Sequence, residues 1–162
     1  MSLADDQLGS FLAAIASDAP APGAGSGAAV ALAIGLACAR KAIRLTLKHH
    51  PEAEGLAGVE RHLAGLSDQA IAGGEADMAC FSRFIAAMGS GGPEKQQALA
   101  DLVAVGGNLV AIGDEARQKL LEVKTDIYPS MINDISAALA LIAAARSVHN
   151  ACIAESARSL NP

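Results

Sequence analysis

Residues 51–88 read PEAEGLAGVERHLAGLSDQAIAGGEADMACFSRFIAAM. Apolar or small side chains recur along this stretch every three or four residues, which is the period of one face of an α-helix. The positions of this seam are Leu56, Val59, Leu63, Leu66, Ala70, Gly74, Met78, Phe81, Ile85 and Met88. One helix is therefore expected from residue 51 to residue 88, with Gly73-Gly74 as its weakest point. The glycine-rich run that follows, closed by Pro93, ends it.

Four further helices are expected around this one. They cover residues 3–16, with Ser2 as N-cap, and then residues 26–49, 94–123 and 130–159. Pro51 can occupy the first turn of the helix that begins there. The middle of the last helix, residues 135–145, is apolar on every side, which is typical of the central helix of a bundle.

The composition indicates one all-α domain spanning residues 1–162. The chain contains 37 alanines and four aromatic residues, and 52% of its residues are hydrophobic. So little β-branched and aromatic content argues against an all-β domain, and so much apolar content argues against disorder. The net charge of −5 gives no electrostatic reason to expect a nucleic-acid partner.

The lengths of the helices predict an elongated, up-and-down bundle. Helices of about 25 to 38 residues would be roughly 37 to 57 Å long at 1.5 Å per residue. Alanine-rich faces on rods of that length need a partner to cover them, so a homodimer is expected.

Three cysteines point to a reducing compartment. Cys38, Cys80 and Cys152 are an odd number and form no C-x-x-C pair, so we expect free thiols and a cytoplasmic protein. Residues 1–6 show no signal-peptide pattern. Residues 23–39 carry no charge, but they are mostly alanine and glycine and fall short of the roughly 20 strongly apolar residues that span a bilayer. A buried bundle helix is expected there, without a membrane partner.

The run Pro22-Gly23-Ala24-Gly25-Ser26-Gly27 lies directly before a predicted helix. Glycines let backbone N–H groups face outward together, and the helix N-terminus adds partial positive charge. Such a turn suits an anionic or carbonyl-bearing ligand, although a flexible lead-in to a helix would have the same composition. Neither the dinucleotide fingerprint nor the P-loop pattern fits.

Acidic side chains within apolar helices are a second candidate site. Asp77 lies in the middle of a predicted helix, where neither helix propensity nor capping favours an aspartate. Asp134 lies in the first turn of the last helix, where stabilisation of the helix dipole is an alternative explanation. Asn150, late in the same apolar helix, is a further polar group that needs a partner.

Basic side chains form a row on the second helix. Arg40, Arg44 and Lys48 recur at intervals of four and would form one positive edge, either as a solvated face or as a binding site for an anionic tail. The four histidines form neither an H-x-x-x-H pair nor a cluster with glutamate, so no metal site is predicted.

Several short motifs, taken in order, resemble one known family. They are Pro20-Ala21-Pro22-Gly23-Ala24-Gly25-Ser26-Gly27, Arg44-Leu45-Thr46, Asp77-Met78-Ala79-Cys80-Phe81, Asn133-Asp134-Ile135 and His149-Asn150-Ala151-Cys152-Ile153. Together they resemble the C-terminal domain family of formiminotransferase-cyclodeaminase, which includes stand-alone methenyltetrahydrofolate cyclohydrolases. The correspondence covers nearly the whole chain.

This resemblance implies a dimeric helical bundle that binds a reduced folate as substrate, with no separate cofactor. Members hydrolyse 5,10-methenyltetrahydrofolate to the 10-formyl form, or close 5-formiminotetrahydrofolate with loss of ammonia. Asp134 or Asp77 would then be the acid/base and electrostatic partner of the cationic carbon. The remaining implied roles are folate binding by Pro22, Gly23, Gly25 and Ser26, a hydrogen bond from Asn150, and binding of glutamate carboxylates by Arg40, Arg44 and Lys48.

Four features depart from the family pattern. Ala24 replaces the middle glycine of the turn, Lys41 begins a pair that is usually Met-Val, and Asn133 replaces a serine. The Gly-Asn approach to the last helix is also missing and is replaced by Asp126-Ile127-Tyr128-Pro129. Two alternatives to a folate enzyme therefore stay open: a non-catalytic bundle that binds a reduced folate or small anion, and a helical module that serves only assembly.

Overall fold

The computed structural model describes residues 7–89 and 92–160, with the backbone alone at Glu54. Over these residues the chain forms five α-helices and two short 3-10 turns, and no strand. The helices are α1 (Gln7–Ile15), α2 (Ala24–His49), α3 (Glu54–Ala87), α4 (Pro93–Val123) and α5 (Ile132–Leu160). The turns are η1 (Lys124–Asp126) and η2 (Pro129–Met131), between α4 and α5. The predicted all-α fold is confirmed.

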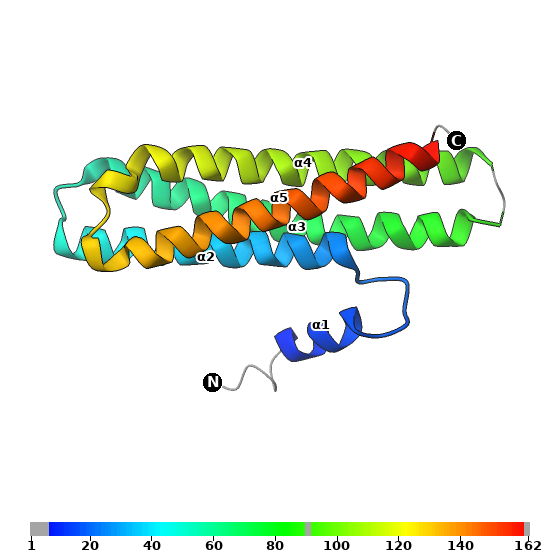
Figure 1. Cartoon of the computed structure of the whole chain (residues 1–162), viewed down its shortest axis with the longest axis horizontal. Helices are drawn as coiled ribbons and strands as arrows, with labels where there is room; N and C mark the ends of the chain where they lie inside the picture. The colour runs from blue at the N-terminus through cyan, green and yellow to red at the C-terminus, as the bar shows by residue number, and fades with distance from the viewer. Residues whose placement is uncertain (1–6, 90–91, 161–162) are drawn as a thin grey trace.

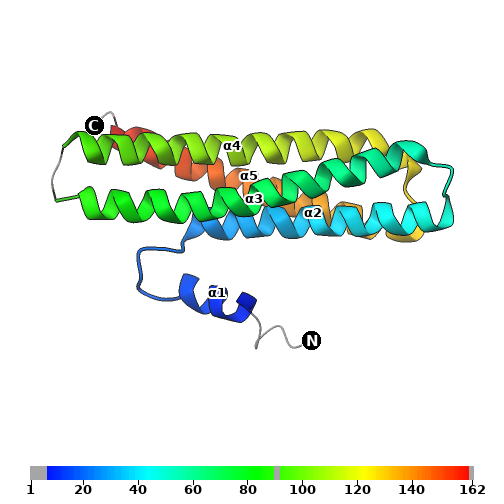
Figure 2. The same ribbon diagram turned by 180° about the vertical axis from the view of Figure 1, so that it is seen from behind.

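Four of the helices form an elongated up-and-down bundle. Helix α2 packs against α3 and α5, and α4 packs against the same two helices, so the four stand in a ring. Figure 2, from behind, shows that α1 lies outside this ring, beside the N-terminal half of α2. Helix α1 has no buried residue, so the bundle core belongs to α2–α5.

The boundaries differ from the predictions by a few residues. Helix α2 begins at Ala24 and not at residue 26, because Gly23 serves as the N-cap with an extended backbone. Helix α3 begins at Glu54, because the Ala53 N–H bonds to the His50 carbonyl and forms a turn there; Pro51 is therefore not in the helix. Helix α4 begins at Pro93 rather than 94, and α5 follows η2, two residues after the predicted start. The predicted cap Ser2 and residues 3–6 lie outside the described residues.

The expectation that residues 135–145 form a central helix is wrong within one protomer. Helix α5 stands at a corner of the ring and contacts α2 and α4. It buries Ile135, Ala138, Ile142 and Ala145 on one side, and its other side exposes alanines. Alanine makes a helix apolar all round without requiring burial all round, because each methyl group is small.

Among the described residues, one segment is long and apolar enough to cross a membrane by length and composition. It is residues 129–160, and residues 23–39 do not meet this test. This test uses length and composition alone. In the bundle, 22% of the most apolar window is buried, where α5 packs against α2 and α4. Helices α2 and α5 approach closely at Gly35, where an added Cβ would lie 3.1 Å from the Ala138 carbonyl oxygen. Small residues in both helices therefore permit this close packing.

Thr46 connects α2 to the segment that leads into α5. Its side chain is fully buried; Oγ1 donates to the Ala42 carbonyl at 2.8 Å and accepts the Tyr128 N–H at 3.0 Å. Thr46→Val is expected to lower the free energy of unfolding by about 1 to 3 kcal/mol, because it leaves the Tyr128 N–H without its partner. Urea unfolding measures this loss. Thr46→Ser keeps the hydroxyl, and an equal loss in that variant would show that the methyl group matters instead.

Candidate functional site

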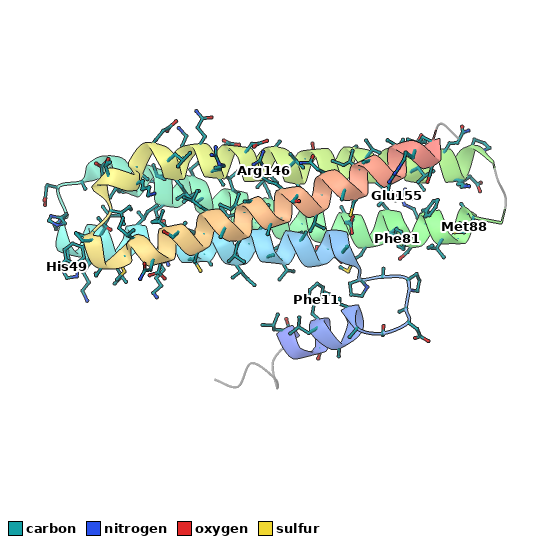
Figure 3. All side chains as sticks on the ribbon, in the orientation of Figure 1. Phe11, His49, Phe81, Met88, Arg146 and Glu155 are labelled. Carbon is teal, nitrogen blue, oxygen red and sulfur yellow. The ribbon has the colours of Figure 1, made fainter. Side chains whose placement is uncertain are left out.

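A cavity of about 490 Å³ opens at the end of the bundle where α2 begins. Helix α5 starts beside α2 and crosses obliquely toward α4, so that α2 and α5 diverge at this end (Figure 1). The cavity residues come from all four bundle helices and the segment before α2: Pro20, Ala21, Gly23, Ala24, Gly25, Asp77, Phe81, Leu102, Gly106, Val148, His149, Ala151, Cys152, Glu155 and Ser156. Figure 3 shows Phe81 and Glu155 at this end and His49 at the other.

The turn before α2 is held closed by Ser26. Its Oγ accepts the Gly23 N–H at 3.0 Å and donates to the Gly23 carbonyl at 3.1 Å, and the side chain is 1% exposed. The hydroxyl of Ser26 therefore shapes the turn and does not line the cavity, and neither does Pro22. Ala24 is already the first residue of α2, so the alanine at this position requires no left-handed backbone.

Asp77 of α3 brings a carboxylate against the N-terminus of α2. An added Cβ on Gly25 would lie 2.4 Å from Asp77 Oδ1, so only glycine leaves room for the carboxylate here. The Ser26 backbone N–H donates a hydrogen bond to it. Burial raises the pKa of Asp77, and the Ser26 hydrogen bond opposes part of that rise. The carboxylate is half-buried, lines the cavity and faces the positive end of a helix.

Helix α5 supplies the opposite wall. His149 is 1% exposed, and burial lowers the pKa of its imidazole. Burial and then the charge of Asp77 raise the pKa of the Cys152 thiol, which places the thiol within electrostatic range of the carboxylate. Sequence reasoning assigned no role to His149. One feature of the sequence could have singled it out: His149 is a titratable side chain that lies between Val148 and Cys152 in an otherwise apolar helix.

Asp134 lies elsewhere in the protomer. It occupies the first turn of α5, where Lys41 Nζ lies 3.2 Å from its Oδ1. His149 follows fifteen residues later, about 22 Å along the helix axis. Asp134 does not line the cavity, so one protomer does not bring the two candidate carboxylates together. Lys41, one of the departures from the family pattern, supplies a partner for Asp134.

The basic row also lies away from the cavity. The Nε atoms of Arg40 and Arg44 are 3.0 and 2.8 Å from Glu60 Oε1, and Lys48 is exposed. Asn150 is exposed and does not line the cavity. Of the polar side chains singled out from the sequence, the cavity contains Asp77, beside the backbone of Gly23 and Gly25. Within the described residues, no three His, Cys, Asp or Glu side chains are grouped to hold a metal ion.

Comparisons with known proteins agree with this architecture. Residues 7–154 match the sequence profile of the family described as formiminotransferase-cyclodeaminase. The fold is similar to the crystal structure of a formiminotetrahydrofolate cyclodeaminase from Thermotoga maritima, with a TM-score of 0.86 and 19% sequence identity. The alignment covers 99% of this chain and 82% of that one. A search of curated protein sequences finds no match.

Proposed function

The chain belongs to the formiminotransferase-cyclodeaminase family, and from that premise we propose that it binds a reduced folate in the cavity beside Asp77 and acts on the carbon between N5 and N10. The reaction is either hydrolysis of 5,10-methenyltetrahydrofolate to the 10-formyl form or closure of 5-formiminotetrahydrofolate with release of ammonia. Both reactions pass through a cationic, amidinium-type carbon and move protons to and from nitrogen.

The position of Asp77 carries this proposal. Its carboxylate lines a mainly apolar cavity, and within the described part of the chain no lysine or arginine forms an ion pair with it. A half-buried carboxylate without a cationic partner is costly, and a cationic ligand reduces that cost. Asp77 therefore complements the positive carbon of the substrate, which it would stabilise electrostatically.

The surroundings of Asp77 suit a flat ring system. The cavity volume of about 490 Å³ lies within the roughly 300 to 1,000 Å³ typical of small-molecule sites. Gly23 and Gly25 contribute backbone without side chains, and Phe81 offers an aromatic surface. Pro20 and Glu155 are exposed and form part of the rim, so a longer ligand tail can extend into solvent.

An activity assay with both substrates tests the proposal. We expect the purified protein to accelerate either the loss of methenyltetrahydrofolate absorbance or its formation from 5-formiminotetrahydrofolate. Asp134→Asn is the matched control and is expected to retain the rate, because Asp134 lies outside the cavity. If neither reaction exceeds the buffer rate at high protein concentration, the proposed reaction is wrong. Thermal stabilisation by tetrahydrofolate would then indicate a non-catalytic binder, and unchanged melting an assembly module.

We also propose that the chain forms a homodimer through the face that α2 and α5 share. Lys41 of α2 forms an ion pair with Asp134 of α5 and so marks the side of α2 that faces α5. Ile34, which is 45% exposed, lies two helical turns before Lys41 and therefore on the same side of α2. Ala137 and Ala144 follow Asp134 on the same side of α5 and are exposed. These small and apolar side chains form a surface that a second copy can cover closely.

Ile34→Glu is expected to convert this dimer into a monomer, because it places a charge in an apolar interface. Sedimentation equilibrium at micromolar concentration measures the mass. Leu121→Glu on α4, which replaces an equally exposed apolar residue outside this face, is expected to remain dimeric. A monomeric wild-type protein would exclude the dimer itself, and a dimeric Ile34→Glu variant would exclude this face.

A further inference from the structure

Helix α2 begins without a capping side chain. Its N-cap residue is Gly23, which has an extended backbone and no side chain that could accept the N–H groups of the first turn. The N–H of Ser26, the third residue of the helix, donates instead to the carboxylate of Asp77 on α3. A side chain from a neighbouring helix therefore takes the place that a serine or aspartate at the N-cap usually has.

Ser26 closes this first turn through its side chain. Its Oγ accepts the Gly23 N–H at 3.0 Å and donates to the Gly23 carbonyl at 3.1 Å. These two bonds hold a glycine, the residue type with the widest backbone freedom. The Ser26 side chain is 1% exposed and lines a second cavity of about 180 Å³, not the cavity that contains Asp77. Its hydroxyl therefore acts on the site through the turn and not by contact with a ligand.

Two glycines bring α2 and α3 close together at this turn. An added Cβ on Gly25 would lie 2.4 Å from Asp77 Oδ1, and one on Gly74, three residues before Asp77, would lie 3.0 Å from the Cβ of Ala29. Packing at Gly74 fixes the distance between the two helices. The position of the first turn relative to the carboxylate then depends on how that turn is closed.

We propose that Ser26 is a positioning residue for Asp77: its hydroxyl closes the first turn of α2 on Gly23, and the closed turn holds the carboxylate where it meets the cationic carbon of the folate. This inference rests on the proposed function and replaces the direct folate contact that the family resemblance implies for Ser26. The glycine at the N-cap belongs to the same arrangement, because a side-chain oxygen there would compete with Asp77 for the Ser26 N–H.

Ser26→Ala is expected to lower kcat about 10-fold and to change KM less than about threefold, because the carboxylate is displaced while the apolar walls remain. A looser turn also weakens the hydrogen bond that opposes the rise of the Asp77 pKa. The acidic limb of the kcat/KM profile should therefore move to higher pH. The other titratable groups that line the cavity are all on α5, and the Ser26 hydroxyl bonds to none of them within the described residues: His149, Cys152 and Glu155.

Two further serine variants serve as controls. Ser26→Thr keeps the hydroxyl, and the second cavity leaves room for the added methyl group, so most of the wild-type kcat and the wild-type pH profile should be retained. Ser17→Ala removes a similar pair of bonds from the exposed turn after α1, where Ser17 Oγ donates to the Ala14 carbonyl at 2.7 Å and accepts the Ala19 N–H at 3.2 Å. It should keep the wild-type rate.

A pair of variants at Gly23 tests the same arrangement while the Ser26 side chain stays in place. An added Cβ on Gly23 has no atom within 4 Å, and its φ of −137° suits any residue, so Gly23→Ser and Gly23→Ala should both fold. The hydroxyl of Gly23→Ser can accept the Ser26 N–H in place of Asp77. Relative to Gly23→Ala, it should lower kcat severalfold and move the acidic limb to higher pH, with a melting temperature at least as high.

The outcomes separate this inference from the proposed function. An active wild-type protein whose Ser26→Ala variant keeps its kcat would overturn the role of Ser26 and leave the proposed function standing. A rate lowered by one factor at every pH, or lowered equally in Ser26→Thr, would overturn it too. Should Ser26→Ala fail to fold by circular dichroism, equal rates and pH profiles in the two Gly23 variants would overturn the inference. A wild-type protein without activity on either substrate would overturn the proposed function and this inference together.

Discussion

Replacing Asp77 with asparagine is expected to lower kcat by about 10³-fold and to raise the melting temperature at the same time. The loss of rate follows because the amide carries no charge to stabilise the cationic carbon, a contribution typically worth about 10² to 10³ or more. The asparagine Oδ1 can still accept the Ser26 N–H. The local structure at the start of α2 is therefore expected to persist.

The gain in stability follows from the direction of the pKa shift. Burial raises the pKa of Asp77 above its unfolded value of about 3.9, so the folded protein holds the proton more tightly than the unfolded chain does. Stability contributed by this group is present below the unfolded pKa and is lost as the pH rises through the folded pKa. At neutral pH the charged carboxylate therefore destabilises the fold, and the neutral amide removes that cost.

Thermal unfolding of both proteins between pH 4 and pH 7 measures this effect. The difference in melting temperature should grow with pH, and a gain of about 1 kcal/mol would appear as roughly 2 to 4 °C in a chain of this size. Asp134→Asn controls for the removal of one acidic charge outside the cavity. If the Asp77→Asn protein is inactive and also less stable than the wild type, Asp77 acts mainly as a structural cap for α2.

Gly25→Ala is expected to lower kcat by about 10²-fold and the free energy of unfolding by about 1 to 3 kcal/mol. The new Cβ would lie 2.4 to 2.6 Å from three atoms of the Asp77 carboxyl group, so the carboxylate or the start of α2 must move. A displacement of that size separates the carboxylate from the reacting carbon. Steady-state kinetics and urea unfolding on the same preparation measure the two losses.

Gly65→Ala is the matched control for that substitution. Gly65 lies in α3, where an added Cβ has no atom within 4 Å, so alanine should leave kcat unchanged and stabilise the helix by about 0.5 to 1 kcal/mol. If Gly25→Ala keeps full activity, the contact between Gly25 and Asp77 does not position the carboxylate for catalysis.

The sequence allowed most of the helices to be predicted, because their signals are local. The three- and four-residue period of α3 runs through Gly73-Gly74 without a break in the helix. At these two positions α3 lies close to its neighbours, with Gly73 next to Leu109 of α4 and Gly74 next to Ala29 of α2. The predicted starts of α2 and α3 were wrong by a few residues, because helix starts depend on caps and turns. The predicted central position of α5 was wrong, because hydrophobicity does not show how much of an alanine-rich helix surface the other helices of one protomer cover.

The candidate site was predicted in part. Composition and helix position drew attention to the glycine turn and to Asp77, and both lie at one cavity. The same criteria also selected Asp134 and the basic row, which lie far along the bundle. Asp134 pairs there with Lys41, and Arg40 and Arg44 pair with Glu60. His149 was missed because a histidine within an apolar helix shows neither its burial nor its lack of a partner until its neighbours are placed.

The sequence by itself determined that this chain is a set of long antiparallel helices from the formiminotransferase-cyclodeaminase family, because helix period, breaks and ordered motifs are properties of neighbouring residues. Only the tertiary structure decided which polar groups share a space. The oblique path of α5 brings His149 and Cys152 opposite Asp77 and the start of α2, and it leaves Asp134 at the other end. That path depends on close packing between residues distant in the chain, such as Gly35 against Ala138, which no local pattern shows.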